Sequence, residues 1–269
     1  MGILNVTPDS FSDGGRYLTP EAAIQRARAM ADEGADLIDV GGESSRPGAE
    51  SVSEAEELRR ILPVVEAVAA SVPAPLSIDT TKAEVAKRAL AAGAAVINDI
   101  SAMRFDPAMP RTIAESGAGA ILMHMQGTPR TMQESPQYAD VVEEVKEFLR
   151  MRARAAQDAG IEEERILLDP GIGFGKNREQ NLTLLRNLTA LAEMGRPLCV
   201  GLSRKSFIGA VTGQALADRL PGSLAGAVTA WLLGAQVLRV HDVKETVAAL
   251  TTAAAIMGDG LTGSGRGST

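Results

Sequence analysis

The 269-residue sequence predicts a single α/β domain in which eight parallel strands close into a (β/α)8 barrel. Short apolar runs typical of strands alternate with longer amphipathic patterns typical of helices, and the pair repeats eight times. The runs are almost continuously apolar, as expected for strands that are buried on both faces. Eight such units match the usual TIM barrel of about 250 residues, and an open doubly wound sheet is the alternative fold.

Each predicted unit consists of one strand and the helix that follows it along the chain. The strands are expected at Ile3–Val6, Asp36–Val40, Leu76–Asp79, Ala95–Asn98, Ala120–His124, Arg165–Asp169, Leu198–Leu202 and Val237–Val240. The helices are expected at Pro20–Glu33, Ser53–Ser71, Lys82–Ala92, Pro107–Ser116, Tyr138–Ala159, Arg178–Glu193, Pro221–Gly234 and Val243–Met257. The pattern Ser53-x-x-Glu56 is typical of a helix N-terminus, where a hydroxyl caps free backbone N–H groups.

The periodic pattern ends with the last predicted helix. We therefore expect one barrel domain over residues 1–257, because no shift in composition marks a second domain. Residues 258–269 are rich in Gly, Ser and Thr and have no periodicity, which predicts a flexible tail.

Composition excludes several classes of function. The formal net charge of −7 disfavours broad nucleic-acid binding, which needs clustered Lys and Arg. The longest apolar stretches, such as Ala225–Gln236, are too short to span a membrane, and no signal-peptide pattern is visible. Cys199 is the only cysteine, so the chain has no internal disulfide or thiolate zinc site. A cytoplasmic protein fits these features.

Polar side chains stand where the predicted strands end. Active sites of this fold lie at the carboxyl ends of the strands, so these side chains are expected to share one rim. Local turn formation by Asp and Asn is the competing explanation for any one of them. The set comprises Asn5, Asp39, Asp79, Asn98, Asp99, His124, Asp169, the run Ser203–Ser206, Arg239 and His241.

The carboxylates and amides of this rim suggest what the site binds. Asp79, Asn98 and Asp169 are expected to point together into the barrel mouth, where they would bind the edge of a flat heterocycle bearing amino and ring N–H donors. Three oxygen ligands to a metal ion are the alternative, and spacing alone does not decide between the two.

The basic side chains suggest a second feature of the ligand. Arg46, Arg204, Lys205, Arg239 and His241 fall at the same rim, and the loops after the seventh and eighth strands commonly bind phosphate in this fold. Two long Gly-rich loops, Thr7–Gly15 and Gly41–Gly48, are expected to move over the site. The Gly171-x-Gly173-x-Gly175 run matches neither nucleotide-binding pattern, which excludes that function for it.

Taken in order, the motifs of these loops and strands resemble those of the dihydropteroate synthase family. They span residues 1–242 and read MGILNVTPDSFSDGG, GGESSRPG, SIDT, INDI, MHMQGTP, LDPGIGFGK, GLSRKS and RVHD. One motif alone would be a weak signal, whereas the ordered series is specific.

The resemblance implies a role for each matching residue of the site. Pterin binding is implied for Asp79, Asn98, Met123, Asp169, Phe174, Gly201 and Lys205. Pyrophosphate binding is implied for Ser45, Arg46, Arg239 and His241, with Asn5 binding Mg²⁺ as the cofactor. The p-aminobenzoate site would comprise Phe11, Pro47, Ser203 and Lys205. The residues implied in catalysis are Asp9, Lys205, Arg239 and His241.

The resemblance also implies the reaction and the partners. The enzyme would condense 6-hydroxymethyl-7,8-dihydropterin pyrophosphate with p-aminobenzoate, giving 7,8-dihydropteroate and pyrophosphate by way of a pterin cation. Sulfonamide sensitivity and a homodimer formed through barrel helices follow from the same resemblance. The alternatives are a pterin-binding methyltransferase, which would not need the SRKS and RVHD cations, and a non-catalytic pterin-binding protein. A sugar-phosphate barrel enzyme would leave the acidic edge unexplained.

Overall fold

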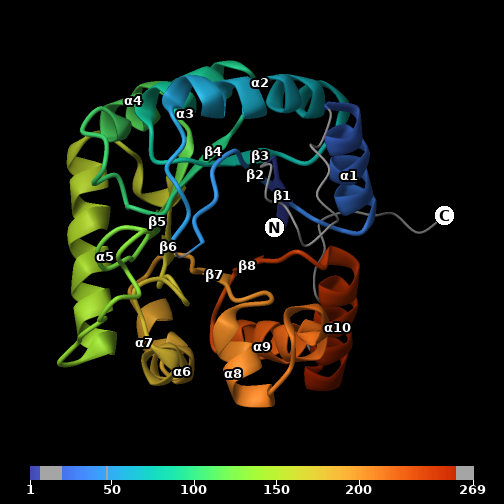
Figure 1. Cartoon of the computed structure of the whole chain (residues 1–269), viewed down its shortest axis with the longest axis vertical. Coiled ribbons are helices and arrows are strands. Elements are labelled where there is room, and N and C mark those ends of the chain that lie inside the picture. The colour runs from blue at the N-terminus through green and yellow to red at the C-terminus, as the bar shows by residue number, and fades with distance from the viewer. Residues whose placement is uncertain (7–19, 47, 259–269) are drawn as a thin grey trace.

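The computed structural model describes residues 1–6, 20–46 and 48–258, and shows a ring of helices around a central set of strands (Figure 1). The strands are β1 (Gly2–Asn5), β2 (Ile38–Gly41), β3 (Leu76–Asp79), β4 (Val96–Asp99), β5 (Gly119–Met123), β6 (Ile166–Asp169), β7 (Cys199–Gly201) and β8 (Val237–Arg239). All strand pairings are parallel, in the order β1 to β6 and β7 to β8.

Backbone bridges between the two strand groups close the barrel. Leu168 bridges to Leu198 and so joins β6 to β7, while Gly2 bridges to Val240 and joins β1 to the end of β8. The N–H of Ile3 donates to the carbonyl of Val240 at 2.9 Å across this last seam. The (β/α)8 prediction is confirmed, and closure excludes the open doubly wound sheet.

The helices follow the predicted order with two differences. Helix α8 was not expected, and the predicted helix at Arg178–Glu193 is divided into α6 and α7. Asn187 separates α6 from α7 with non-helical angles of φ −111° and ψ 22°, and its side chain donates to the carbonyl of Thr183 at 2.8 Å. Such a side-chain bond competes with the helical backbone. The bounds are α1 (Pro20–Asp32), α2 (Glu54–Ser71), α3 (Ala83–Ala91), α4 (Met109–Ser116), α5 (Val141–Asp158), α6 (Arg178–Arg186), α7 (Leu188–Ala192), α8 (Ser206–Thr212), α9 (Leu220–Leu232) and α10 (Val243–Met257).

The sheet register sorts the barrel interior into layers. Register partners of parallel strands point to the same face of a sheet. Asn5, Gly41, Asp79 and Asn98 are linked in this way and form a layer at the carboxyl end of the strands. The layer below it contains Ile3, Asp39, Ser77 and Val96. The fold therefore places the predicted polar groups at one rim and puts Asp39 one layer beneath them.

The core lies mainly between the strands and the surrounding helices. Fully buried side chains such as Ile38, Ile78 and Leu122 from the strands meet Ile61 of α2 and Ile113 of α4 in one apolar cluster. Burying one such side chain contributes roughly 1.5–3 kcal/mol, so this layer holds the helices on the barrel. The predicted cap of α2 is confirmed, because the Ser53 hydroxyl accepts from the Glu56 N–H.

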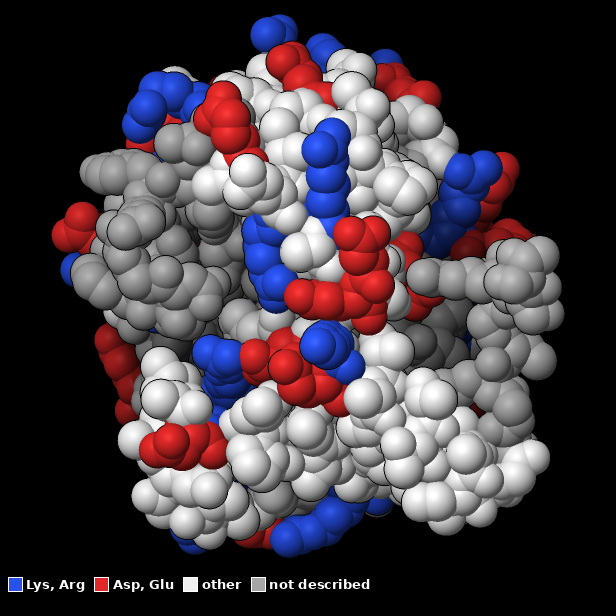
Figure 2. All heavy atoms as spheres, turned by 90° about the vertical axis from the view of Figure 1, so that its right-hand side faces the viewer, with Lys and Arg blue, Asp and Glu red and all other residues white. Residues whose placement is uncertain are grey.

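The surface bears mixed charge. On the face shown in Figure 2, the Lys and Arg side chains lie among Asp and Glu side chains rather than in a separate basic patch. Within the part of the chain that the structure describes, no helix combines the length and apolarity required to cross a membrane. The predicted tail lies, apart from Gly258, outside the described residues, so its flexibility stays a prediction.

Candidate active site

A cleft of about 790 Å³ opens at the carboxyl ends of the strands. Its walls come from both halves of the barrel, since the loops after β2, β6, β7 and β8 contribute to it. The predicted site residues that line it are Asn5, Ser45, Arg46, Asp79, Phe174, Ser203, Lys205, Arg239 and His241. The chain thus brings together residues from all three predicted subsites.

The other predicted residues lie around or outside this cleft. Asn98, Met123 and Asp169 are buried at the ends of β4, β5 and β6, and Gly201 ends β7. Met123 joins a small apolar cluster with Ile100, Met125 and Met132, against which Phe174 packs. Three further predictions, Asp9, Phe11 and Pro47, lie outside the described residues.

One guanidinium group connects three of the strands. Arg239 of β8 donates from Nε to Asp39 of β2 at 2.6 Å and from Nη2 to Asp79 of β3 at 2.8 Å. The Asn98 amide also donates to the same Asp39 oxygen at 3.2 Å. Burial raises the pKa of Asp79 to about 7, and Arg239 opposes that rise. The predicted pterin and pyrophosphate residues are therefore joined by ion pairs.

Lys205 stands across the cleft mouth beside the loop that follows β6. Its ammonium donates to the carbonyl of Ile172 and lies 4.7 Å from the centroid of the Phe174 ring. Burial lowers the pKa of Lys205 to about 8, partly offset by the neighbouring Asp169 carboxylate. A cation above an aromatic ring and beside buried carboxylates suits a flat, polar ligand.

His241 contributes a neutral ring to the site. Burial, together with the nearby Arg239, lowers its pKa to about 4, so the ring is uncharged at neutral pH. Its Nδ1 lies 3.0 Å from the Ser203 hydroxyl oxygen. The sequence grouped His241 with the cations, whereas the structure shows a neutral ring that is hydrogen-bonded to Ser203.

Arg204 forms an ion pair with Asp242 at the edge of the cleft. Its Nε donates to Asp242 at 2.9 Å, and its own carbonyl accepts from Arg219. The other predicted rim cations that line the cleft are Arg46, Lys205 and Arg239, of which Arg239 is already paired with Asp39 and Asp79. Arg46 is exposed in the loop after β2, where it can reach a phosphate group.

The residues around Asn5 are compatible with Mg²⁺ held jointly with a substrate phosphate. Gly41 keeps space open beside Asn5, because a Cβ there would lie 3.9 Å from the Asn5 Oδ1 and 3.8 Å from an Asp79 oxygen. Within the described ranges, no group of three His, Cys, Asp or Glu side chains forms a metal cage. Mg²⁺ characteristically uses few protein oxygens together with waters and substrate phosphates.

Lys176 fastens the loop that carries Phe174, a role that the sequence did not reveal. Its buried ammonium donates to the carbonyls of Gly171 at 3.0 Å and Phe174 at 2.9 Å, and lies 2.9 Å from Nδ1 of His124. Burial lowers the pKa of His124 to about 2, so the ring is neutral. Gly171 has a φ of +66°, and a Cβ there would lie 1.9 Å from the His124 carbonyl oxygen. Glycine is required at this close approach.

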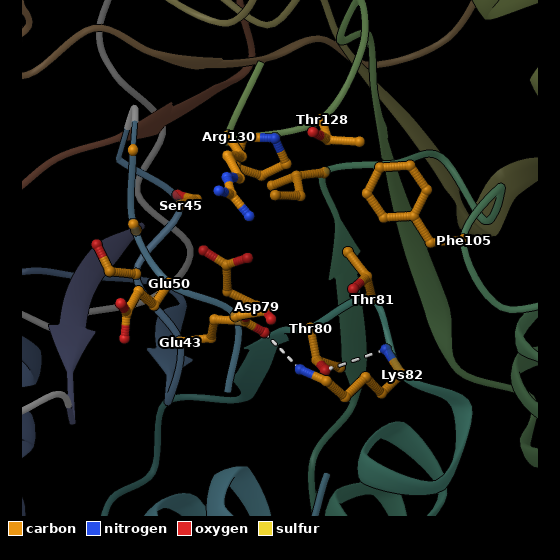
Figure 3. A pocket seen from close by; sticks show the side chains of 16 residues that line it. Glu43, Ser45, Glu50, Asp79, Thr80, Thr81, Lys82, Phe105, Thr128 and Arg130 are labelled. Carbon is orange, nitrogen blue, oxygen red and sulfur yellow. Dashed lines mark hydrogen bonds and ion pairs between the residues drawn. The ribbon is translucent and has the colours of Figure 1, made fainter. Parts of the chain in front are cut away.

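A second cavity of about 720 Å³ adjoins the cleft and shares Glu43, Ser44, Ser45 and Asp79 with it (Figure 3). Lys82 forms ion pairs there with Glu43 and with the fully buried Glu57 of α2. The other Glu43 oxygen accepts from the Val52 N–H at 3.0 Å. These contacts anchor the base of the loop that presents Ser45 and Arg46.

We expect Lys176→Met to lower the free energy of unfolding, because each buried carbonyl left without a donor costs about 1–3 kcal/mol. Lys87→Met is the matched control, since that lysine is exposed on α3 and its substitution should change stability by at most about 0.5 kcal/mol. Urea unfolding of both variants measures the difference. Equal, small effects would contradict the role given to Lys176.

Comparison with known proteins shows which family and which relatives this chain is similar to. The family model described as pterin binding enzyme matches residues 1–241. The dihydropteroate synthase of Escherichia coli (strain K12) is 50% identical over 250 residues, which cover 93% of this chain and 88% of that protein.

Two solved structures are similar in both sequence and fold. Yersinia pestis dihydropteroate synthase with a sulfonamide drug complex has a TM-score of 0.92 and 48% identity, and the match covers 96% of this chain and 94% of that one. Xanthomonas albilineans dihydropteroate synthase in complex with 7,8-dihydropteroate has a TM-score of 0.85 and 47% identity, over 96% and 92% of the two chains.

Proposed function

Since this chain belongs to the dihydropteroate synthase family of pterin-binding enzymes, we propose that it condenses 6-hydroxymethyl-7,8-dihydropterin pyrophosphate with p-aminobenzoate. The products are 7,8-dihydropteroate and pyrophosphate, and the enzyme is a transferase of folate biosynthesis. The single observation that carries the proposal is the pairing of Arg239 with Asp79, because it joins an acidic edge suited to a pterin with a basic end suited to pyrophosphate.

The pterin ring enters the barrel mouth above Asp79 and Asn98. Its aminopyrimidinone edge carries N–H donors, which match the carboxylates of Asp79 and Asp169 and the amide of Asn98. Lys205 binds the ring carbonyl and a ring nitrogen, while Met123, Phe174 and Gly201 pack against the ring. Supporting this arrangement, Lys205 already lies over Phe174 and next to Asp169.

The pyrophosphate end lies toward β1, β2 and β8. Ser45, Arg46 and Arg239 bind phosphate oxygens, and the neutral His241 ring donates an N–H to them. Asn5 would hold Mg²⁺ together with the pyrophosphate, and the ion would stabilise the negative charge of the leaving group. Fixed cations and N–H donors stabilise that charge without any reorganisation during the reaction.

The bond between the pterin methylene carbon and the pyrophosphate oxygen breaks first, and both electrons leave with pyrophosphate. The resulting pterin cation is attacked by the amine nitrogen of p-aminobenzoate, which then loses a proton to solvent. Ser203, Lys205, Phe11 and Pro47 bind this second substrate. Asp9 supports the developing positive charge from the first loop. Exclusion of water by the loops prevents hydrolysis of the cation.

The assembly is proposed to be a cytoplasmic homodimer formed through barrel helices. Large apolar side chains are exposed at Leu232 of α9 and at Val247, Ile256 and Met257 of α10. These two helices are in contact with one another. Burial of such a surface between two copies is favourable.

We expect purified protein with Mg²⁺, dihydropterin pyrophosphate and p-aminobenzoate to release pyrophosphate and to form dihydropteroate. Mass spectrometry identifies the product and a coupled assay follows pyrophosphate. Pterin binding without this product would favour a methyltransferase or a non-catalytic binding protein. Failure to bind any pterin would contradict the proposed site as a whole.

Pterin binding should weaken as pH rises through about 8. The folded-state pKa of Lys205 is lowered to about 8, so its ammonium is present below that pH and is lost above it. Titration calorimetry with 6-hydroxymethylpterin between pH 7 and 9.5, with tris-free buffers of matched ionic strength, measures the effect. Lys205→Arg keeps its charge throughout and serves as the control. A wild-type affinity that does not change with pH would contradict this account of Lys205.

Sulfonamides are expected to inhibit the enzyme by competing with p-aminobenzoate. The loop motifs that would hold the aminobenzoate ring contain no inserted residues that exclude the drug. Initial rates at several p-aminobenzoate concentrations should show a rising apparent KM and an unchanged kcat. Turnover that is unaffected by excess drug at limiting p-aminobenzoate would be inconsistent with this binding site.

A further inference from the structure

We propose that Asp39 is a positioning residue that fixes the orientation of the Asn98 side-chain amide and thereby sets which edge of a heterocycle the site accepts. The inference rests on the proposed function, because it takes the ligand of Asn98 to be a pterin. Asp39 itself does not touch the ligand. It acts through Asn98, which occupies the layer above it.

The register of the sheet shows why Asp39 supports the site without lining it. Asp39 of β2 is partnered with Ser77 of β3, and Asn98 of β4 is partnered with Asp79. Asp39 is fully buried, and the cleft is lined by Asp79 and Arg239 above it. A ligand in the cleft therefore contacts the upper layer, whose side chains rest on Asp39.

The hydrogen bonds at Asp39 permit one orientation of the amide. The Oδ2 atom of Asp39 accepts from Arg239 at 2.6 Å and from the amide nitrogen of Asn98 at 3.2 Å. Arg239 is always a donor, so this Oδ2 atom is an acceptor. An oxygen that accepts can bind only the NH₂ side of the amide. The carbonyl oxygen of Asn98 is consequently directed to the ligand side.

In this orientation, the side chains beneath the ligand present hydrogen-bond acceptors to it. Asn98 then offers an oxygen beside the carboxylate of its register partner Asp79, and both suit a ring that bears N–H and NH₂ donors. If the amide turned over, an NH₂ group would face the amino group of the ring, and two donors would meet without a hydrogen bond. A buried polar group left unpaired in this way is the basis of strong discrimination between ligands.

The test substitution is Asp39→Ala, which removes the Oδ2 atom that Asn98 and Arg239 share. Without that acceptor, Asn98 is free to present either its oxygen or its NH₂ group to the ligand. Asp39→Asn is the conservative control, because its amide oxygen can still accept from both Arg239 and Asn98. The preference of the site for amino-bearing rings should fall in Asp39→Ala and be retained in Asp39→Asn.

The experiment compares the binding of 6-hydroxymethylpterin with that of the same pteridinone lacking the 2-amino group, by titration calorimetry on the full chain. Wild type and Asp39→Asn should prefer the amino-bearing ring, and Asp39→Ala should reduce that preference at least tenfold. In the Asn98→Ala background the same Asp39→Ala change should leave the preference unaltered, since the proposed effect on ligand preference is exerted through the Asn98 amide. An Asp39→Ala chain that weakens both ligands equally, or neither, would overturn the proposal.

Nuclear magnetic resonance tests the amide directly in the free wild-type protein, and so covers an Asp39→Ala chain that does not fold. The side-chain NH₂ signals of Asn98, assigned by their loss in Asn98→Ala, should exchange with water at least a hundredfold more slowly than those of Asn177, which is exposed. Equal exchange rates would overturn the proposal. A wild type that binds neither pteridinone would contradict the proposed function, while the exchange measurement would still decide the position of the amide.

Discussion

The site depends on one partly buried guanidinium that forms ion pairs with two carboxylates. Arg239 pairs with Asp39 and Asp79, which come from two other strands on the opposite side of the barrel seam. Burial of a carboxylate costs folding free energy unless the group is ion-paired and hydrogen-bonded. The same cation is available to an anionic leaving group at the rim. In the proposed function, pterin recognition and pyrophosphate recognition therefore share one charged group, Arg239.

Loops that are anchored at defined points on both sides of the cleft complete this arrangement. The carbonyls of the loop after β6 are held by Lys176, by Tyr138 and by Gln133, so Phe174 has a defined position under Lys205. On the other side, the ion pairs of Lys82 hold the base of the loop after β2. Catalysis by charge stabilisation requires such groups to be in place before the substrate arrives.

The sequence predicted the strands well because they are short apolar runs, several of which end in a polar residue, as at Asp79 and Asp169. It could not show the break at Asn187, which results from one side-chain bond inside an otherwise helical pattern, or the short helix α8. The order of the motifs identified the candidate site residues. Their protonation states and contacts follow from burial and from the sheet register, which the sequence does not show. The neutral state of His241 and the contact of Arg204 with Asp242 depend on neighbours that are remote in sequence. Sequence alone also gave Asp39 no role beyond the end of a strand.

The most direct test of the shared cation is the affinity of Arg239→Gln for two ligands that differ only in the pyrophosphate group. Calorimetry with 6-hydroxymethylpterin and with its pyrophosphate ester, at fixed pH and ionic strength, measures both. If Arg239 organises Asp39 and Asp79, binding of the pterin alone should weaken as well as binding of the ester. If only the ester binds more weakly and the pterin is unaffected, Arg239 serves the pyrophosphate alone and the central claim is wrong.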